Sequence, residues 1–150
     1  MIRPAKVEDL LHIEQLIKEF YDESLKDFIS LDPTSIRNTI LNFIDSHIVL
    51  VDDDLKGIIA GTLAYSIFDN KELFAQEHMW YVSKENRKSI LGLELLSAFE
   101  NKAKELKANR IIIIHMDNLN GNLMEKLYKH RGYKRMEYNF IKEVTHETLA

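Results

Sequence analysis

Two basic residues, Arg87 and Lys88, stand directly before a long amphipathic segment, where they could help to bind an anion. They belong to a polar turn at residues 83–88, which follows the apolar and aromatic residues 79–82 of a predicted strand. The first turn of a helix leaves backbone N–H groups unpaired and carries a partial positive charge. Amides and cations together could therefore hold a phosphate here. Taken alone, however, the pattern more often represents an ordinary strand–turn–helix with solvated basic residues.

Several other kinds of chemistry are excluded by the sequence. It has no cysteine, which excludes disulfides and thiol nucleophiles, and its six histidines show no metal-ligand spacing. The run Asp52-Asp53-Asp54 could start a calcium loop, but Lys56 and Leu63 stand where such a loop needs oxygen ligands, so we expect a solvated turn. The sequence also lacks a Gly-x-Ser-x-Gly motif and a Walker loop. We therefore expect no metal and neither hydrolase nor NTPase chemistry.

The composition is that of an ordinary globular chain. Its 150 residues are enough for one domain with a sizeable core, and 45% of them are hydrophobic and 29% charged. The net charge of −4 does not indicate a nucleic-acid-binding surface. Residues 1–4 show no apolar signal segment, and the longest aliphatic run, Ile111–Ile114, is far too short to span a membrane. We expect a single domain over residues 1–150, soluble and cytoplasmic, with no nucleic-acid or membrane partner.

The elements that position the basic turn are predicted by apolar periodicity. Residues 89–107 are expected to form a helix, preceded by a strand at 73–82 and followed by one at 110–116. Four consecutive isoleucines indicate that the last of these is a parallel strand, buried on both faces, so the three elements would form a right-handed crossover. The buried face of the helix is predicted from its four-three-four-three spacing to be Gly92, Leu96, Phe99, Ala103 and Leu106.

The remaining elements complete a mixed sheet. Further strands are predicted at 2–5, 47–51, 56–68 and 133–142, and further helices at 7–25, from Asp32-Pro33 onward, and at 123–130. The element order is βααβββαβαβ. Because three consecutive central strands are antiparallel and one crossover is parallel, we predict an α/β (α+β) fold with a mixed central sheet and helices on both faces.

Three motifs occur in order along the chain. The first is Ile2-Arg3-Pro4-Ala5 followed by Glu8-Asp9, the second runs from Tyr81-Val82 through Arg87 to Gly92 and Leu95-Leu96, and the third is Leu127-Tyr128-Lys129-His130-Arg131-Gly132-Tyr133. They resemble the first strand, the acetyl-CoA motif and the Tyr-x-x-x-Gly-Phe/Tyr signature of the GCN5-related N-acetyltransferases, the GNAT superfamily. The Arg-Lys-Ser loop and the ending Glu137-x-x-Phe140-x-Lys142 resemble phage-type members.

The resemblance implies acetyl-CoA as co-substrate. Backbone groups of Tyr81 and Val82 would pair with its pantetheine arm, and Arg87 and Lys88 would add positive charge beside its pyrophosphate. The Ser89 side chain has two interpretations, a helix cap or a phosphate contact. The amides that would hold the pyrophosphate belong to Lys88, Ser89, Ile90, Leu91, Gly92 and Leu93.

One position departs from the family pattern, and the correspondence of two asparagines to it is loose. The family usually has its first loop glycine where this chain has Ile90, which resists the φ values and the close backbone approach that glycine permits. Gly92 is present, and its missing side chain would allow tight contact between helix and sheet. Asn120 or Asn122 would correspond to a CoA-contacting asparagine, or would simply form a turn.

The resemblance also implies direct transfer of acetyl to a primary amine. Tyr128 would protonate the departing thiolate, since a phenol stays protonated at neutral pH; alternatively it only packs. Glu77 is the candidate general base, directly or through a water molecule, with His78 as the alternative. On a regular strand, Glu77 would share a face with Met79 and Tyr81, and His78 would lie on the opposite face.

Two functional classes remain open at this point. The first is an N-acetyltransferase that acts on a small-molecule or peptide amine. The resemblance leaves a homodimer open, since dimers are common in such folds. The second is a non-catalytic module that binds acyl-CoA or a protein partner, with Ile90 marking a degraded cofactor loop. Binding of acetyl-CoA and release of a thiol in the presence of amines would distinguish them.

Overall fold

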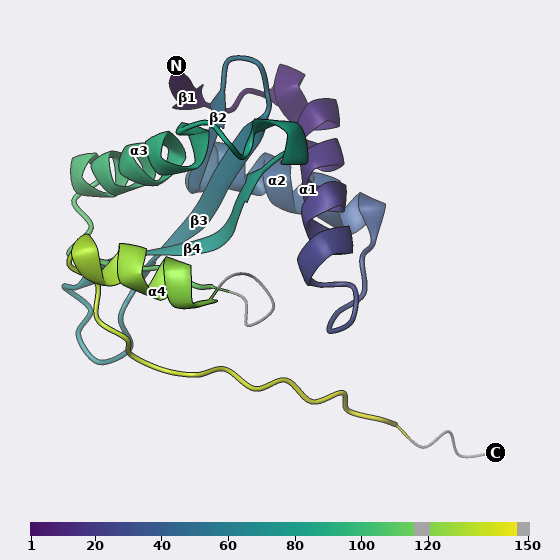
Figure 1. Ribbon diagram of the computed structural model, residues 1–150. Helices are drawn as coiled ribbons and strands as arrows, with labels where there is room; N and C mark the ends of the chain where they lie inside the picture. Colours follow the sequence, from purple (N-terminus) through teal and green to yellow (C-terminus); the bar gives the residue numbers. More distant parts are fainter. Residues whose placement is uncertain (116–120, 147–150) are drawn as a thin grey trace. The chain divides into compact units, whose positions relative to one another are not determined.

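The computed structural model describes residues 1–115 and 121–146. The chain forms two compact units, one from Met1 to Ile114 and one from His115 onward (Figure 1). The larger unit contains the sheet and three of the α-helices, and the smaller one contains a single described α-helix.

A mixed five-stranded sheet forms the centre of the larger unit. Its strands are β1 (Ile2–Pro4), β2 (Ile48–Asp52), β3 (Gly57–Tyr65), β4 (Leu73–Val82) and β5 (Arg110–Ile112), in the spatial order β1-β2-β3-β4-β5. The first four pair antiparallel, and β5 pairs parallel to β4. The predicted mixed sheet is confirmed, with its parallel crossover between β4 and β5.

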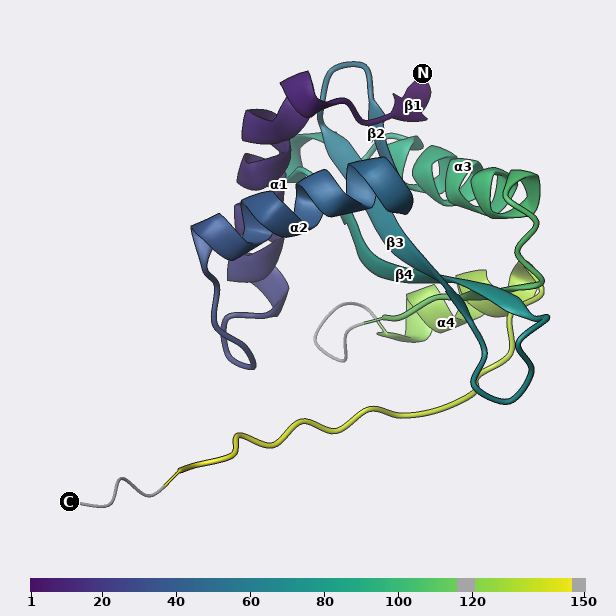
Figure 2. The ribbon, with the colours of Figure 1, turned by 180° about the vertical axis from the view of Figure 1, so that it is seen from behind.

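Helices cover both faces of this sheet. The helices α1 (Leu10–Ser24) and α2 (Pro33–Ser46) lie on one face and α3 (Leu91–Glu105) lies on the other (Figures 1 and 2). Short 3-10 turns precede two of them, η1 (Val7–Asp9) before α1 and η2 (Lys84–Asn86) before α3. At the start of α2, the Asp32 carboxylate accepts the Ser35 N–H at 3.0 Å and Pro33 follows the cap, as the sequence predicts.

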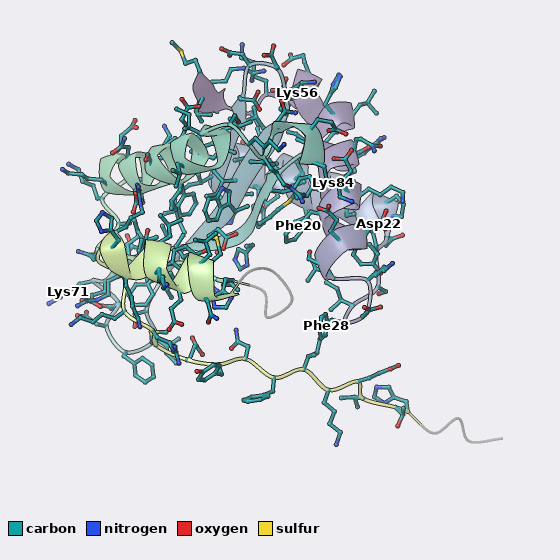
Figure 3. All side chains as sticks on the ribbon, viewed as in Figure 1. Phe20, Asp22, Phe28, Lys56, Lys71 and Lys84 are labelled. Carbon is teal, nitrogen blue, oxygen red and sulfur yellow. The ribbon has the colours of Figure 1, made fainter. Side chains whose placement is uncertain are left out.

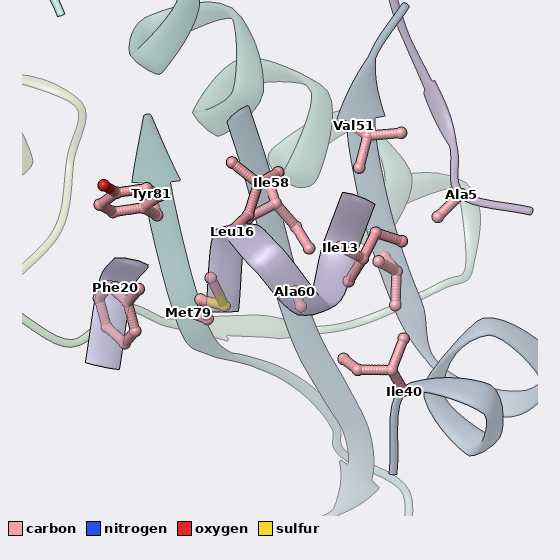
Figure 4. Close-up of a cluster of buried hydrophobic side chains, with 11 residues drawn as sticks. Ala5, Ile13, Leu16, Phe20, Ile40, Val51, Ile58, Ala60, Met79 and Tyr81 are labelled. Atoms are coloured by element: carbon pink, nitrogen blue, oxygen red, sulfur yellow. The ribbon is translucent and has the colours of Figure 1, made fainter. Parts of the chain in front are cut away.

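The core beneath α1 and α2 is built from alternate residues of the strands. Ile13 of α1, Val51 of β2 and Ile58 of β3 are completely buried, and Met79 and Tyr81 of β4 extend the cluster (Figure 4). On the other face, the buried residues of α3 are Leu95, Leu96, Phe99 and Ala103. The predicted buried face of this helix is therefore largely right, but Leu106 is 38% exposed because α3 ends before it.

Two predicted strands differ from the structure. The strand expected at 110–116 ends at Ile112, and Ile111–Ile114 are only partly buried because β5 lies at an edge of the sheet. The strand expected at 133–142 is also wrong, since residues 133–146 have no regular secondary structure. The alternating pattern of this segment has no described ladder to join, and residues 134–146 are exposed.

The turn between β2 and β3 uses one of the three aspartates as an acceptor. The Asp52 carboxylate, 7% exposed, accepts N–H groups from Asp54, Lys56 and Gly57 at 3.2, 2.7 and 2.8 Å. Its oxygens thus hold the predicted turn, but Asp52 is buried rather than solvated, because these three N–H groups surround its carboxylate.

Candidate active site

A β-bulge interrupts β4 in the middle of the sheet. Ala60 of β3 pairs with Met79, whereas the next residue, Gly61, pairs with Glu77. His78 is therefore an extra residue on β4 at this point. Bulges commonly lie beside active sites, where they redirect side chains.

Glycine is required opposite the bulge. A Cβ atom on Gly61 would lie 2.3 Å from the carbonyl oxygen of Gln76 and 2.8 Å from the Phe99 ring. The backbone oxygen cannot move away without breaking the ladder. This bulge was not predicted from the sequence, although an isolated glycine inside a strand pattern is a recognised signal for one.

The bulge changes which side chains share a face. The His78 ring lies 6.3 Å from the ring of Phe43 on α2, and Met79 belongs to the core beneath α1 and α2. Glu77 instead pairs with Gly61, whose Cβ position points toward α3. The prediction that Glu77 and Met79 share a face, with His78 opposite, is therefore wrong, because one extra residue shifts the alternation.

The Glu77 carboxyl group lies where β4 and β5 separate. The parallel ladder ends at Gln76 and Ile112, and beyond it the Ile114 N–H donates to Glu77 Oε2 at 3.2 Å. The residue is only 4% exposed. Burial raises the pKa of Glu77 to about 8, and the hydrogen bond from Ile114 offsets part of that effect. A buried carboxyl with such a pKa, at an opening of the sheet, is a candidate for proton transfer.

The alternative base, His78, has a different environment. Its Nε2 lies 2.9 Å from the Thr62 hydroxyl. Desolvation, together with the nearby His47, lowers the pKa of His78, so the ring is neutral at pH 7. His47 itself accepts the Leu63 N–H through Nδ1 at 3.1 Å. The structure therefore separates the two candidates, with Glu77 at the strand opening and His78 beside α2.

The turn between β4 and α3 is ordered by its own hydrogen bonds. The buried Ser83 hydroxyl accepts from the Asn86 side chain at 2.8 Å. The Ser89 hydroxyl donates to the Asn86 carbonyl at 2.6 Å and accepts the Leu91 N–H at 3.2 Å. Of the two interpretations of Ser89, the geometry favours the cap, because this hydroxyl holds the first residue of α3.

The start of α3 presents unpaired backbone amides. Among the described residues, no hydrogen-bond acceptor faces the N–H groups of Lys88, Ile90, Gly92 or Leu93. The first intrahelical bond comes later, from Glu94 N–H to the Ile90 carbonyl at 3.0 Å. Free amides at the first turn of a 15-residue helix are the geometry that binds anions.

Ile90 departs from the family pattern and Gly92 matches it, and neither residue has the role expected from the sequence. Ile90 has φ −83°, so its backbone needs no glycine, and its side chain is 66% exposed. A Cβ on Gly92 would meet Trp80 and Val82 at 3.7 Å, an ordinary contact, so tight helix–sheet packing does not depend on this glycine. That prediction is wrong; the close approach occurs at Gly57, whose Cβ would lie 2.8 Å from Leu95.

Arg87 is held in place by three groups. Its Nε donates to the Val82 carbonyl at 2.8 Å, its Nη2 donates to Glu23 Oε2 at 2.5 Å, and its guanidinium lies 5.2 Å from the centre of the Tyr81 ring. Burial, together with the Glu23 carboxylate, raises the pKa of Tyr81. No local pattern predicts the pairing of Arg87 with Glu23, because 64 positions separate the two residues.

The backbone groups at the end of β4 point in alternating directions. The Ser83 N–H donates to the Lys56 carbonyl of the preceding hairpin at 2.9 Å. In an antiparallel ladder every second residue bonds to the same neighbour, so Tyr81 directs its N–H and C=O at β3 and Val82 directs them away. Of the two residues expected to pair with a pantetheine arm, Val82 has its backbone groups at the open edge.

In the smaller unit, Tyr128 lies on α4 (Gly121–His130). Its ring is buried, 5.8 Å from the Tyr133 ring and 6.4 Å from the His115 ring. The helix ends before Gly132, which has φ +92°, as predicted. Of the two asparagines, Asn122 is exposed in the first turn of α4, and Asn120 lies outside the described residues.

These features define a class of protein. The sheet opens at the carboxyl end of its parallel strand β4, and the amide-rich start of α3 follows directly. In open α/β sheets, ligands bind outside the carboxyl ends of the parallel strands. The sequence profile of the Acetyltransferase (GNAT) family matches residues 13–133, so the chain belongs to this family, whose chemistry is acetyl transfer from acetyl-CoA. No protein with a curated description matches the sequence significantly.

Solved structures share the fold along almost the whole chain. A possible acetyltransferase from Clostridium difficile 630 is 19% identical with a TM-score of 0.74, covering 97% of this chain and 98% of that one. A ribosomal-protein-alanine N-acetyltransferase from Brucella melitensis biovar Abortus 2308 is 14% identical with a TM-score of 0.73, covering 96% and 99%. An aminoglycoside antibiotic 6'-N-acetyltransferase from Acinetobacter haemolyticus is 15% identical with a TM-score of 0.67, covering 97% and 99%.

Two further observations concern residues 1–115 and 121–146. No helix there combines the length and apolar character needed to cross a membrane. No group of three or more histidine, aspartate or glutamate residues in this part of the chain is placed to hold a metal ion.

Proposed function

We propose that this protein transfers the acetyl group of acetyl-CoA directly to a primary amine of a small molecule or peptide. The observation that carries the proposal is the row of unpaired amides at Lys88, Ile90, Gly92 and Leu93, placed after the open end of β4 in a chain of the GNAT family. A diphosphate fits such a row, because each oxygen can accept N–H groups that have no partner within residues 1–115 and 121–146. The exposed Lys88 side chain adds a positive charge.

The thioester arm would extend along the open edge of β4. Val82 offers its N–H and C=O there, so an amide of the arm can pair with them like a residue of an added strand. This arrangement would place the thioester near Glu77, where the sheet has opened. Positioning a thioester beside an amine supplies much of the rate enhancement that such a reaction needs.

The proposed transfer needs neither a metal nor a covalent enzyme intermediate. The amine nitrogen forms a bond to the thioester carbonyl carbon, the tetrahedral oxyanion collapses, and the C–S bond breaks. The amine loses a proton, for which Glu77 in its ionised form is the proposed acceptor, directly or through water. The departing thiolate gains a proton, for which the Tyr128 hydroxyl is the proposed donor.

A non-catalytic acyl-CoA-binding or protein-binding module is the second candidate. The exposed apolar side chain of Ile90 favours it, because this side chain stands beside the amides where the family usually has glycine. The engagement of Arg87 by Glu23 also favours it, since a paired cation attracts an anion less strongly.

A pair of measurements separates these candidates. Calorimetry with acetyl-CoA tests the cofactor site, and thiol release in the presence of a panel of primary amines tests turnover. For the proposed enzyme, Tyr128→Phe should retain acetyl-CoA binding and lose at least about tenfold in thiol release, because the acid is removed without changing ring packing. Binding without thiol release from any amine would favour the module, and absence of binding at millimolar acetyl-CoA would reject the cofactor site.

A further inference from the structure

The last turn of α1 contributes a carboxylate to the turn before α3. Glu23 lies 2.5 Å from Arg87 Nη2 and 3.5 Å from Lys84 Nζ. Partial burial alone would raise the pKa of Glu23, but the hydrogen bonds from Arg87 and Tyr81 outweigh it and the pKa is lowered. Glu23 is therefore ionised at neutral pH. Figure 3 labels Lys84 and two residues of this part of α1, Phe20 and Asp22.

The same contacts fix where Arg87 lies. With Nη2 on Glu23, its Nε donates to the Val82 carbonyl at 2.8 Å. The Phe20 ring packs against the Tyr81 ring with centres 6.0 Å apart, which holds the tyrosine beneath the guanidinium. Arg87 thus occupies the one acceptor that Val82 offers at the open edge of β4.

These positions conflict with a bound acyl-CoA. An arm that pairs with Val82 needs the carbonyl that Arg87 holds, and a diphosphate near Arg87 meets the carboxylate of Glu23 as a like charge. Two anions beside one guanidinium repel each other, so the diphosphate and the Glu23 carboxylate would compete for Arg87. When Arg87 leaves, Glu23 still has a cationic partner, because Lys84 Nζ lies 3.5 Å from it.

We propose that Glu23 is an internal competitor of the cofactor for Arg87. Glu23 holds the guanidinium on the Val82 carbonyl until the diphosphate of acyl-CoA displaces the Glu23 carboxylate. This inference rests on the proposed function, since it concerns the same cofactor site. Glu23 thereby sets the affinity for acyl-CoA without contacting it, and acts as a positioning residue for Arg87.

The test compares two neutralised carboxylates on the same helix. Glu23→Gln keeps the shape of the side chain and weakens its hold on Arg87, so coenzyme A should bind about three- to tenfold more tightly by calorimetry. Asp22→Asn is the matched control, because Asp22 lies next in sequence, carries the same charge and pairs with Lys18 at 3.1 Å instead. Its affinity should stay within about twofold of the parent protein, since an exposed pair contributes little.

Each result has a separate meaning. Tighter binding of coenzyme A by Glu23→Gln, but not by Asp22→Asn, supports Glu23 as the internal competitor. Equal tightening in both variants would reflect net charge only and would overturn it, as would weaker binding by Glu23→Gln, which would mean that Glu23 orients Arg87 for the phosphates. If the parent protein binds coenzyme A and Glu23→Gln is unchanged, only this inference fails. If neither binds at millimolar ligand, the proposed cofactor site fails with it.

Discussion

At the scale of a single residue, the buried Glu77 carboxyl makes the stability of the fold depend on pH. It is buried, receives one described hydrogen bond, from Ile114 N–H, and has a pKa of about 8 instead of 4.5. The folded protein therefore keeps this proton between pH 4.5 and about 8, whereas the unfolded chain releases it. Stability must fall as pH rises through this window, by up to about 5 kcal/mol, and then level off.

Glu77→Gln is predicted to remove this pH dependence. The glutamine oxygen can still accept the Ile114 N–H, and the side chain is neutral in both states. Between pH 6 and pH 8, the free energy of unfolding measured with urea should fall about 2–3 kcal/mol more in the parent protein than in the variant.

The exposed Glu105, paired with Lys102 at 3.3 Å, provides the control. Glu105→Gln makes the same substitution at a solvated position, so this variant should follow the pH dependence of the parent protein. Equal slopes for the parent protein and Glu77→Gln would contradict a protonated Glu77 in the fold.

At the scale of elements, the bulge in β4 separates Glu77 from His78 and depends on a glycine of the neighbouring strand. Gly61→Ala would place a Cβ 2.3 Å from the Gln76 carbonyl oxygen. We predict a loss of about 2–4 kcal/mol in unfolding free energy, because relief requires moving the backbone of β3 or β4. Chemical denaturation measures it directly.

Gly92→Ala is the matched control for this substitution. Its new methyl group would make ordinary contacts at 3.7 Å with Trp80 and Val82. Alanine also restricts the unfolded chain, so stability should be unchanged or higher by up to about 1 kcal/mol. Similar losses in both variants would contradict the distinction drawn between the two glycines.

The sequence could predict elements whose signals are local. The N-cap at Asp32, the spacing of Leu96, Phe99 and Ala103, and the end of α4 before Gly132 all depend on neighbours within a few residues, and the structure agrees. Features decided by distant partners were missed. The His78 bulge depends on pairing with β3. Strand β5 ends early, close to Ile114, whose N–H donates to the Glu77 side chain of β4.

The candidate site shows the same division. The polar turn and the helix start were predictable, because a strand, basic residues and an amphipathic run follow one another directly. The pairing of Arg87 with Glu23 was not, since it joins α1 to the turn before α3 across 64 positions. No local pattern encodes such a contact, and only the packing of α1 against the end of β4 creates it.

At the scale of the whole molecule, cofactor binding should appear as added stability. A ligand that binds only the folded chain stabilises it by about 2.7 kcal/mol at one hundred times its Kd. For a chain of 150 residues, this corresponds to a rise in Tm of about 5–10 °C with acetyl-CoA, measured by thermal denaturation. Each further tenfold in ligand should add about 1.4 kcal/mol, so Tm should rise steadily with the logarithm of concentration.

Two lysines show whether this stabilisation comes from the start of α3. Lys88 precedes the unpaired amides, whereas Lys71 lies in the turn between β3 and β4, and both are exposed (Figure 3 labels Lys71). Lys88→Ala should lose about 1 kcal/mol of ligand stabilisation, because one charge-assisted contact to a phosphate is removed. Lys71→Ala should respond to acetyl-CoA like the parent protein. If both variants lose the same stabilisation, ligand binding depends only on net charge. If both respond to acetyl-CoA like the parent protein, the phosphates of the ligand lie away from α3.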